Sequence, residues 1–318
     1  MVNNWVVSTD INKLTVMNIQ QKYALITGGT SGIGYELSKL FARDGYNLVL
    51  VSRSDERLEE VAREFEEQFN VEVKTIAKDL FKPGVAKEIH EQTAQWGLTI
   101  NALVNNAGQA EYGAFVETDL DRDIDLIHLD VIALVSLTKY YLKEMVARNE
   151  GKILNVASSL AVTPTPLMAV YGAAKAFVLS FTEAVIQEVK DTNVSLTALL
   201  PNATDTDFFH KAKATETVAY KKMTFYKPEE VAAAAYQSLQ AGEAKVEPGI
   251  INKVNNFFNR ILPDSVAATV TSGITAPSTS GKQHTEHAAS AEERAAITNQ
   301  TGNREGDFTS HQGHQHED

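Results

Sequence analysis

Cysteine is absent from this chain of 318 residues. Its absence excludes disulfide bonds, thiolate metal sites and cysteine nucleophiles, and it fits a reducing compartment. Positive charge is also scarce, because 29 Lys and Arg residues stand against 41 Asp and Glu residues. The resulting net charge of -12 argues against nucleic acid as a main partner.

Long hydrophobic runs are missing as well. No stretch of about eighteen apolar residues occurs, so we expect no membrane-spanning helix. The N-terminus, Met1 to Trp5, lacks the basic segment followed by an apolar segment that marks a secretory signal. We therefore expect a cytoplasmic protein with a polar N-terminal arm over residues 1–20. Met17, just upstream of the first expected strand, is an alternative start of translation.

What the chain does contain is 43% hydrophobic residues, enough to bury the core of one large α/β domain over residues 21–262. Short apolar segments alternate with amphipathic ones along this domain. The expected strands cover residues 23–27, 46–51, 71–77, 102–104, 152–156, 194–200 and 245–250. The expected helices cover residues 35–44, 55–70, 82–96, 118–148, 170–190, 228–240 and 252–262. This alternation predicts a doubly wound parallel sheet with right-handed crossovers.

A glycine-rich turn, Gly28 to Gly34, follows the first expected strand and leads into the first expected helix. That order is the setting in which a dinucleotide is bound. Glycines permit a tight turn and let the backbone approach a pyrophosphate at the positive end of the helix. The turn lacks the Lys-Ser/Thr pair of a P-loop, so it does not predict an NTPase. A ligand-free glycine turn is the alternative.

The end of the second expected strand reads Val51-Ser52-Arg53-Ser54-Asp55. An acidic residue at the strand end would accept a hydrogen bond from the adenosine ribose and favour NAD, whereas an arginine accommodates a 2′-phosphate. No acid stands at the strand end and Arg53 follows it closely, so we predict NADP(H). A solvated surface arginine is the alternative, and nearby Asp55 complicates the choice.

A tyrosine and a lysine, Tyr171 and Lys175, stand four residues apart on an expected helix, with Ser158 upstream. Positions i and i+4 share a helix face, so the ammonium can lie beneath the phenol and lower its pKa from about 10. A phenol whose pKa approaches the working pH is a useful acid or base. Taken alone, the pair also fits an ordinary helix face with one partly buried lysine.

Together, the glycine turn, Asn105-Asn106-Ala107-Gly108, Ser158, and Tyr171 with Lys175 resemble the motifs of the short-chain dehydrogenase/reductase family in order and spacing. The resemblance covers roughly residues 21–260. It implies a Rossmann fold with the active site in the same domain. It also implies hydride transfer between a nicotinamide ring and a carbonyl or alcohol carbon.

The resemblance further implies a role for individual residues. Tyr171 would be the acid/base, Ser158 would orient and polarise the substrate oxygen, and Lys175 would lower the pKa of Tyr171 and bind the nicotinamide ribose. The residues expected to line the cofactor, besides Tyr171 and Lys175, are Gly28, Thr30, Ser31, Gly32, Ile33, Gly34, Arg53, Asp79, Leu80, Asn105, Asn106, Ala107, Gly108 and Thr206. Family members are commonly dimers or tetramers, so we expect a homo-oligomer.

Two positions depart from the family pattern. Asp130 stands where the family usually has an Asn that helps to hold a helix kink and a water next to the lysine. We include Asp130 among the catalytic candidates and expect activity with an altered pH profile, the water being held by a backbone carbonyl. Asn202 follows Pro201 where the family usually has Gly, and Asn tolerates left-handed backbone angles, so the turn should survive.

The C-terminal third contains two segments of different character. Residues 203–226 would be the substrate loop, and their aromatic residues predict an apolar pocket, although half of them could instead dock the loop to the core. From about residue 276 to 318, a polar tail with five of the eight histidines has too little apolar content to fold. Metal binding by those histidines is the alternative, and we predict no metal site.

These features predict an NADP(H)-dependent oxidoreductase that acts on a carbonyl or alcohol of a moderately apolar small molecule. Two alternatives stay open. One is a non-catalytic NADP(H)-binding sensor on the same fold, against which the intact Ser, Tyr and Lys argue. The other is an epimerase or dehydratase that only borrows the hydride and consumes no net cofactor.

Overall fold

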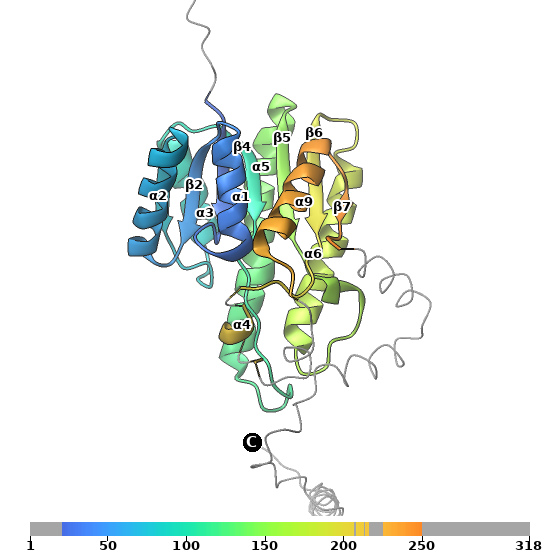
Figure 1. Cartoon of the computed structure of the whole chain (residues 1–318). Coiled ribbons are helices and arrows are strands. Elements are labelled where there is room, and N and C mark those ends of the chain that lie inside the picture. Colours follow the sequence, from blue (N-terminus) through green and yellow to red (C-terminus); the bar gives the residue numbers. More distant parts are fainter. Residues whose placement is uncertain (1–20, 207, 213, 216–224, 250–318) are drawn as a thin grey trace, which may run out of the picture. The chain divides into compact units, whose positions relative to one another are not determined.

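Parallel strands form the centre of the computed structural model, which describes residues 21–206, 208–212, 214, 215 and 225–249 (Figure 1). These residues form a seven-stranded sheet in the order β3-β2-β1-β4-β5-β6-β7. The strands are β1 (Tyr23–Thr27), β2 (Asn47–Ser52), β3 (Val73–Ala77), β4 (Ile100–Asn105), β5 (Gly151–Val156), β6 (Val194–Leu199) and β7 (Lys245–Val246). The predicted single-domain, doubly wound Rossmann fold is confirmed.

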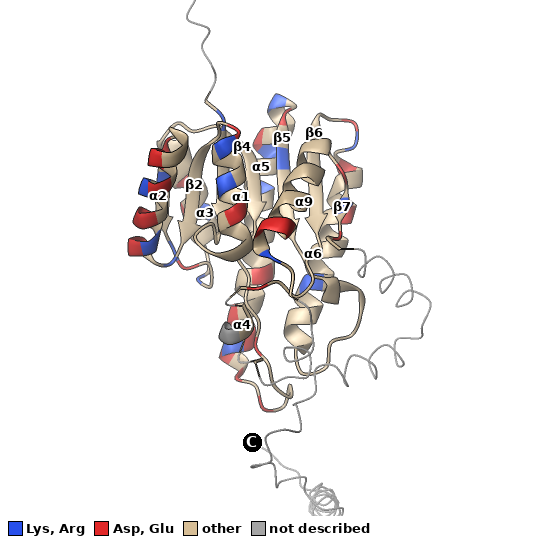
Figure 2. Ribbon diagram, in the orientation of Figure 1, with Lys and Arg blue, Asp and Glu red and all other residues tan. Residues whose placement is uncertain are grey.

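Helices cover both faces of the sheet. They are α1 (Gly32–Arg43), α2 (Asp55–Phe69), α3 (Val85–Gln95), α4 (Leu120–Ile127), the π-helical turn η1 (His128–Ala133), α5 (Leu134–Arg148), the 3-10 turn η2 (Ser159–Val162), α6 (Ala169–Glu188), α7 (Phe208–Lys211) and α9 (Pro228–Ala241). One core layer lies between the sheet and α1, α2 and α9, and the other between the sheet and α3, α5 and α6. Charged residues are frequent along α2 and occupy most of its exposed positions (Figure 2).

Strand β1 shows how the sequence builds both layers. Successive side chains of a strand point to opposite faces, and both faces of a parallel sheet are buried. Tyr23 and Leu25 accordingly pack in one core layer, and Ala24 and Ile26 pack in the other. The apolar run that predicted this strand therefore serves two helix layers at once.

The strand order places a binding crevice next to β1. From β1 the chain moves to β2 and β3 on one side, and then returns to β4, β5 and β6 on the other. Loops that leave the carboxyl ends of β1 and β4 diverge at this switch point, which is where open α/β sheets bind ligands. The glycine turn follows β1, and Asn106 to Gly108 follow β4.

Several element boundaries differ from those predicted. Helix α1 begins at Gly32, three residues before the expected start at Tyr35, because the last part of the glycine turn is already helical. Helix α3 begins after Gly84, whose φ of 81° ends the preceding turn, so Pro83 precedes the helix. Strand β7 covers only Lys245–Val246.

The helix expected over residues 118–148 is interrupted. Its middle, η1, is a π-helical turn, in which each amide bonds five residues back instead of four. The turn separates α4 from α5 and contains Asp130, which is fully buried. Single π turns inside α-helices are frequent at functional sites.

Some predicted segments fall outside the described residues: the N-terminal arm, the helix over 252–262 and the polar tail. The segment over 203–226 is described in part. Its two ends are joined by a bridge between Thr204 and Tyr226, and Asp205 donates a backbone hydrogen bond to the Tyr226 carbonyl. Among the described helices, α6 is long and apolar enough to cross a membrane, but much of it packs inside the protein as a core helix would.

Candidate active site

A cavity of about 790 Å³ opens at the carboxyl ends of the strands. It brings together residues that are far apart in the sequence and that were predicted for one site. The predicted residues that line it are Gly28, Thr30, Ser31, Gly32, Ile33, Arg53, Asp79, Leu80, Asn106, Ala107, Gly108, Ser158, Tyr171, Lys175 and Thr206. The cavity lining does not include Gly34, Asn105 or Asp130. Gly34 and Asp130 instead contact residues that line the cavity, as described below.

The glycine turn is packed too closely for side chains. A Cβ on Gly34 would lie 2.2 Å from the carbonyl oxygen of Gly28 and 2.4 Å from Nδ2 of Asn106. That same Nδ2 donates hydrogen bonds to the carbonyl oxygens of Thr27 (3.0 Å) and Gly28 (3.2 Å). Gly28 has a φ of 66°, which an L side chain rarely adopts. The turn is thus a backbone cradle that the loop after β4 holds in place.

The N-terminus of α1 is suited to an anion. Ser31 is its N-cap, but the Ser31 side chain makes no capping hydrogen bond, and the first turn contains no acidic residue. The first amide groups of a helix lack intrahelical partners and carry positive partial charge. Because Ser31, Gly32 and Ile33 line the cavity, a pyrophosphate fits at this end.

Cations gather where the adenosine end of a dinucleotide would lie. Arg53, Arg57 and Lys78 line the cavity there. The guanidinium of Arg53 lies 5.4 Å from the centre of the Phe81 ring, and Nε of Arg57 donates to the carbonyl oxygen of Thr30 at 3.4 Å. Sequence reasoning missed Arg57, although a second basic residue four positions after Arg53 is visible in the sequence.

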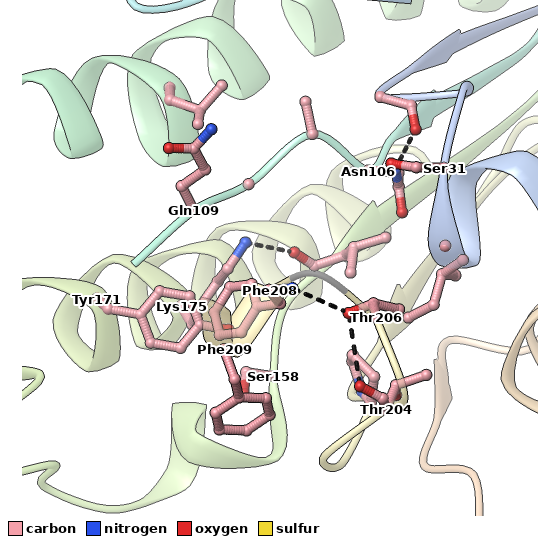
Figure 3. Close-up of a pocket in the computed structure, with 18 of the residues that line it drawn as sticks. Ser31, Asn106, Gln109, Ser158, Tyr171, Lys175, Thr204, Thr206, Phe208 and Phe209 are labelled. Carbon is pink, nitrogen blue, oxygen red and sulfur yellow. Dashed lines mark hydrogen bonds between the residues drawn. The ribbon is translucent and has the colours of Figure 1, made fainter. Parts of the chain in front are cut away.

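Three of the four predicted catalytic residues, Ser158, Tyr171 and Lys175, meet at the other end of the cavity (Figure 3). Ser158, two residues after β5, is 5% exposed, and Tyr171 and Lys175 on α6 are 6% and 3% exposed. The Lys175 ammonium lies 5.7 Å from the centre of the Tyr171 ring. The shared helix face predicted from the i, i+4 spacing therefore exists, and it is turned toward the cavity.

The acidity of Tyr171 differs from the expectation. Burial raises the pKa of the Tyr171 phenol, and the negative charge of Asp130 raises it further. Lys175 lowers that pKa, as expected, and so does the hydroxyl of Ser158. Burial outweighs them, so the pKa of Tyr171 is above its ordinary value. The sequence indicated the lysine but not how completely the phenol is buried.

Asp130 forms a buried ion pair with Lys175. Its Oδ1 lies 3.1 Å from the Lys175 ammonium, which also donates to the carbonyl oxygen of Val156 at 3.0 Å. Burial raises the pKa of Asp130, while Lys175 opposes that rise. Burial disfavours a charged Lys175, but Asp130 and Tyr171 outweigh it and raise the pKa of Lys175. The Asp130 side chain thus contacts Lys175 directly. The sequence had instead suggested a water next to Lys175, held by a backbone carbonyl.

Gly108 makes this contact possible. A Cβ there would lie 2.7 Å from Oδ1 of Asp130 and 3.1 Å from the Lys175 ammonium. The glycine therefore lines the cofactor crevice on one side and leaves room for the ion pair on the other. This second role could not be predicted from the sequence.

The remaining wall of the cavity is mostly apolar. The ring of Phe208 lies 5.3 Å from that of Tyr171, centre to centre, and packs on Phe209. The other residues at this end include Gln109, Tyr112, Leu160, Met168 and Ala214. Of these residues, sequence reasoning named only Phe208 and Phe209. Among the described residues, no group of three or more His, Asp or Glu side chains could hold a metal ion.

The sequence of the chain is similar to a known family and to several known proteins. The family model for short chain dehydrogenases matches residues 22–217. Very-long-chain 3-oxoacyl-CoA reductase from Rattus norvegicus is 36% identical over 248 residues, which cover 76% of this chain and 76% of that protein. Human 17-beta-hydroxysteroid dehydrogenase type 3 is 38% identical over 188 residues, which cover 58% of this chain and 60% of that protein. The reductase from Bos taurus is matched over 58% of its length.

Solved structures agree with the sequence comparison. A short-chain dehydrogenase from Sphingobium yanoikuyae in complex with NADPH superposes with a TM-score of 0.69 and 28% identity. The superposition covers 83% of this chain and 99% of that one. The described fold is therefore one on which a relative binds NADPH.

Proposed function

The chain belongs to the short-chain dehydrogenase/reductase family, and on that premise we propose that it transfers hydride between NADP(H) and the carbonyl or alcohol carbon of an apolar small molecule. One observation supports this proposal above the others. Ser158, Tyr171 and Lys175 converge at one end of a cavity whose other end is a backbone cradle for a pyrophosphate.

Each side chain has a defined task in this reaction. The bound nicotinamide cofactor supplies or accepts the hydride. The Ser158 hydroxyl holds the carbonyl oxygen of the substrate beside the Tyr171 phenol, which gives that oxygen a proton during reduction. The Lys175 ammonium stabilises the phenolate that is left. In alcohol oxidation, the phenolate takes the proton back.

The proposed choice of NADP(H) over NAD(H) is supported by charge. Three cationic side chains, Arg53, Arg57 and Lys78, line the adenosine end, and Asp79 is the one acidic residue among the cavity-lining residues that the structure describes. A guanidinium can hold a phosphate with paired hydrogen bonds. A 2′-phosphate would therefore find complementary charge here.

The proposed substrate is a ketone with a large apolar body. The aromatic and aliphatic side chains next to Tyr171 favour burial of such a group. Two relatives have names that describe large apolar compounds: 3-oxoacyl-CoA thioesters, which are ketones, and hydroxysteroids, which are the alcohols of steroid ketones. We therefore include both classes in the test.

A screen of NADPH oxidation tests the proposal. Purified protein is mixed with NADPH and with 3-oxoacyl thioesters, steroid ketones, aldehydes or quinones, and the loss of NADPH absorbance is followed. We expect turnover with at least one ketone. Tyr171→Phe should lower kcat by about 10²–10⁴-fold, the usual contribution of a general acid, while NADPH still binds. Retained turnover in that variant, or no turnover with any carbonyl, would contradict the proposal.

The expected homo-oligomer and cytoplasmic location stay predictions. Size-exclusion chromatography with light scattering would test the first, and fractionation of the native host would test the second.

A further inference from the structure

The Asp130–Lys175 pair is an unusual feature of the active site. Asp130 is 0% exposed, and its second oxygen, Oδ2, has no hydrogen-bond partner among the described residues. The ammonium of Lys175 donates to Oδ1 of Asp130 and to the Val156 carbonyl. An ammonium has three protons to donate, so two of its three hydrogen bonds are already fixed within the protein.

The charged groups around Tyr171 come from three elements. Lys175 is on the same helix, and Asp130 faces it from η1. From the loop after β4, the backbone of Gln109 lowers the pKa of the Asp130 carboxyl group. Arg122 on α4 also acts on that carboxyl group through its charge. The carboxylate is thus the one negative charge among the groups facing Lys175 that the structure describes.

Resting on the proposed function, we propose that Asp130 is a positioning residue that anchors Lys175 and offsets its charge, so that Tyr171 stays a phenol over a wider pH range. The site is thereby poised to donate a proton in carbonyl reduction. Alcohol oxidation, which needs the phenolate, begins at a higher pH than it would with a neutral residue at position 130.

The charge balance explains the direction of the effect. A lone ammonium beside a phenol favours the phenolate, and a carboxylate 3.1 Å from that ammonium cancels part of its field. Reduction consumes one hydride from the cofactor and one proton from Tyr171, and solvent then restores that proton. The rate of reduction is therefore constant up to the pH at which the Tyr171 phenol ionises and falls above it. The rate of oxidation rises as the phenol ionises.

Asp130→Asn tests this proposal because it removes the charge and keeps the shape. We expect the pH at the midpoint of the kcat/KM profile to be about one unit lower in the variant, both for carbonyl reduction and for alcohol oxidation. Below the wild-type midpoint, oxidation with NADP+ should rise by up to about tenfold, and reduction near neutral pH should change little. Asp121→Asn is the matched control, because it removes an exposed carboxylate from the neighbouring α4. It should leave both midpoints unchanged.

A second measurement does not depend on turnover. Near-ultraviolet absorbance reports phenolate formation, and the difference between each protein and its Tyr171→Phe counterpart isolates Tyr171. The Tyr171 midpoint should be about one pH unit lower in Asp130→Asn than in the unchanged protein, and lower by a similar amount in Asp130→Ser. If neither variant moves the midpoint, the proposal is wrong. If the midpoint falls but no carbonyl is reduced, the charge effect is supported and the proposed function fails.

Discussion

The two ends of the cavity are built by different means. At the nucleotide end, backbone groups and glycines form the surface, and Gly34 and Gly28 lie too close together for any larger side chain. At the catalytic end, the surface rests on a buried ion pair: Lys175 lines the cavity, Asp130 lies behind it, and both are almost fully enclosed. The first end depends on local chain geometry, and the second depends on packing between distant elements.

This difference determines how each end responds to mutation. A backbone cradle fails when atoms are added, because the turn cannot move away from the added atoms. A buried ion pair fails when one partner is removed, because the other charge is left without compensation. Three substitutions test this contrast.

Gly34→Ala should have the largest effect on cofactor binding. Its Cβ would lie 2.2 Å from a backbone oxygen, so the turn must change shape. We expect NADPH affinity, measured by fluorescence titration, to fall by more than about 100-fold, a loss of roughly 2.7 kcal/mol or more. Gly45→Ala is the control: nothing lies within 4 Å of its Cβ, although its φ is 80°. That strain should cost about 1–2 kcal/mol of stability and leave NADPH affinity intact.

Lys175→Met should have the largest effect on stability. It leaves Asp130 buried without its partner, so the free energy of unfolding at neutral pH should fall by about 3–5 kcal/mol. Adding Asp130→Asn should recover a large part of that loss, since the uncompensated charge is then gone. Urea denaturation of the four proteins measures the coupling. A double variant less stable than Lys175→Met alone would refute the ion pair as the source of the loss.

Arg53→Ser should have the smallest effect, confined to cofactor choice. Loss of one phosphate contact should weaken NADPH binding by about tenfold, or roughly 1.4 kcal/mol, and change NADH binding less than about twofold. Arg63→Ser is the matched control, because Arg63 is an exposed residue of α2 paired with Glu59. Equal losses for both cofactors would contradict the proposed 2′-phosphate site.

The same contrast explains what the sequence could predict. The sheet and the glycine turn follow from apolar runs and glycine spacing, which are local patterns, and the predicted bounds of β1 match the structure to the residue. The cavity-lining role of Asn106 and Gly108 followed from a strand end and a family motif. These predictions needed no knowledge of how distant elements pack.

The parts that were missed depend on such packing. Asp130 was noticed as a departure from the family at an expected helix kink, but neither the π-helical form of that turn nor the direct bond to Lys175 follows from a local residue pattern. The raised pKa of Tyr171 follows from complete burial by several elements at once. The apolar residues Tyr112, Leu160 and Met168 come from separate parts of the chain that the sheet brings together.

The π-helical turn η1 has a consequence for how this protein can change over generations. It accommodates one more residue than an α-helical turn, and each α-helical residue rotates the chain by about 100°. Because the turn takes up this extra residue within one turn, losing one residue there would restore a regular helix and leave Leu137, Tyr141 and Met145 of α5 facing the core. A one-residue deletion in this stretch is therefore expected to displace Asp130 from Lys175 while the packing of α5 on the core is kept.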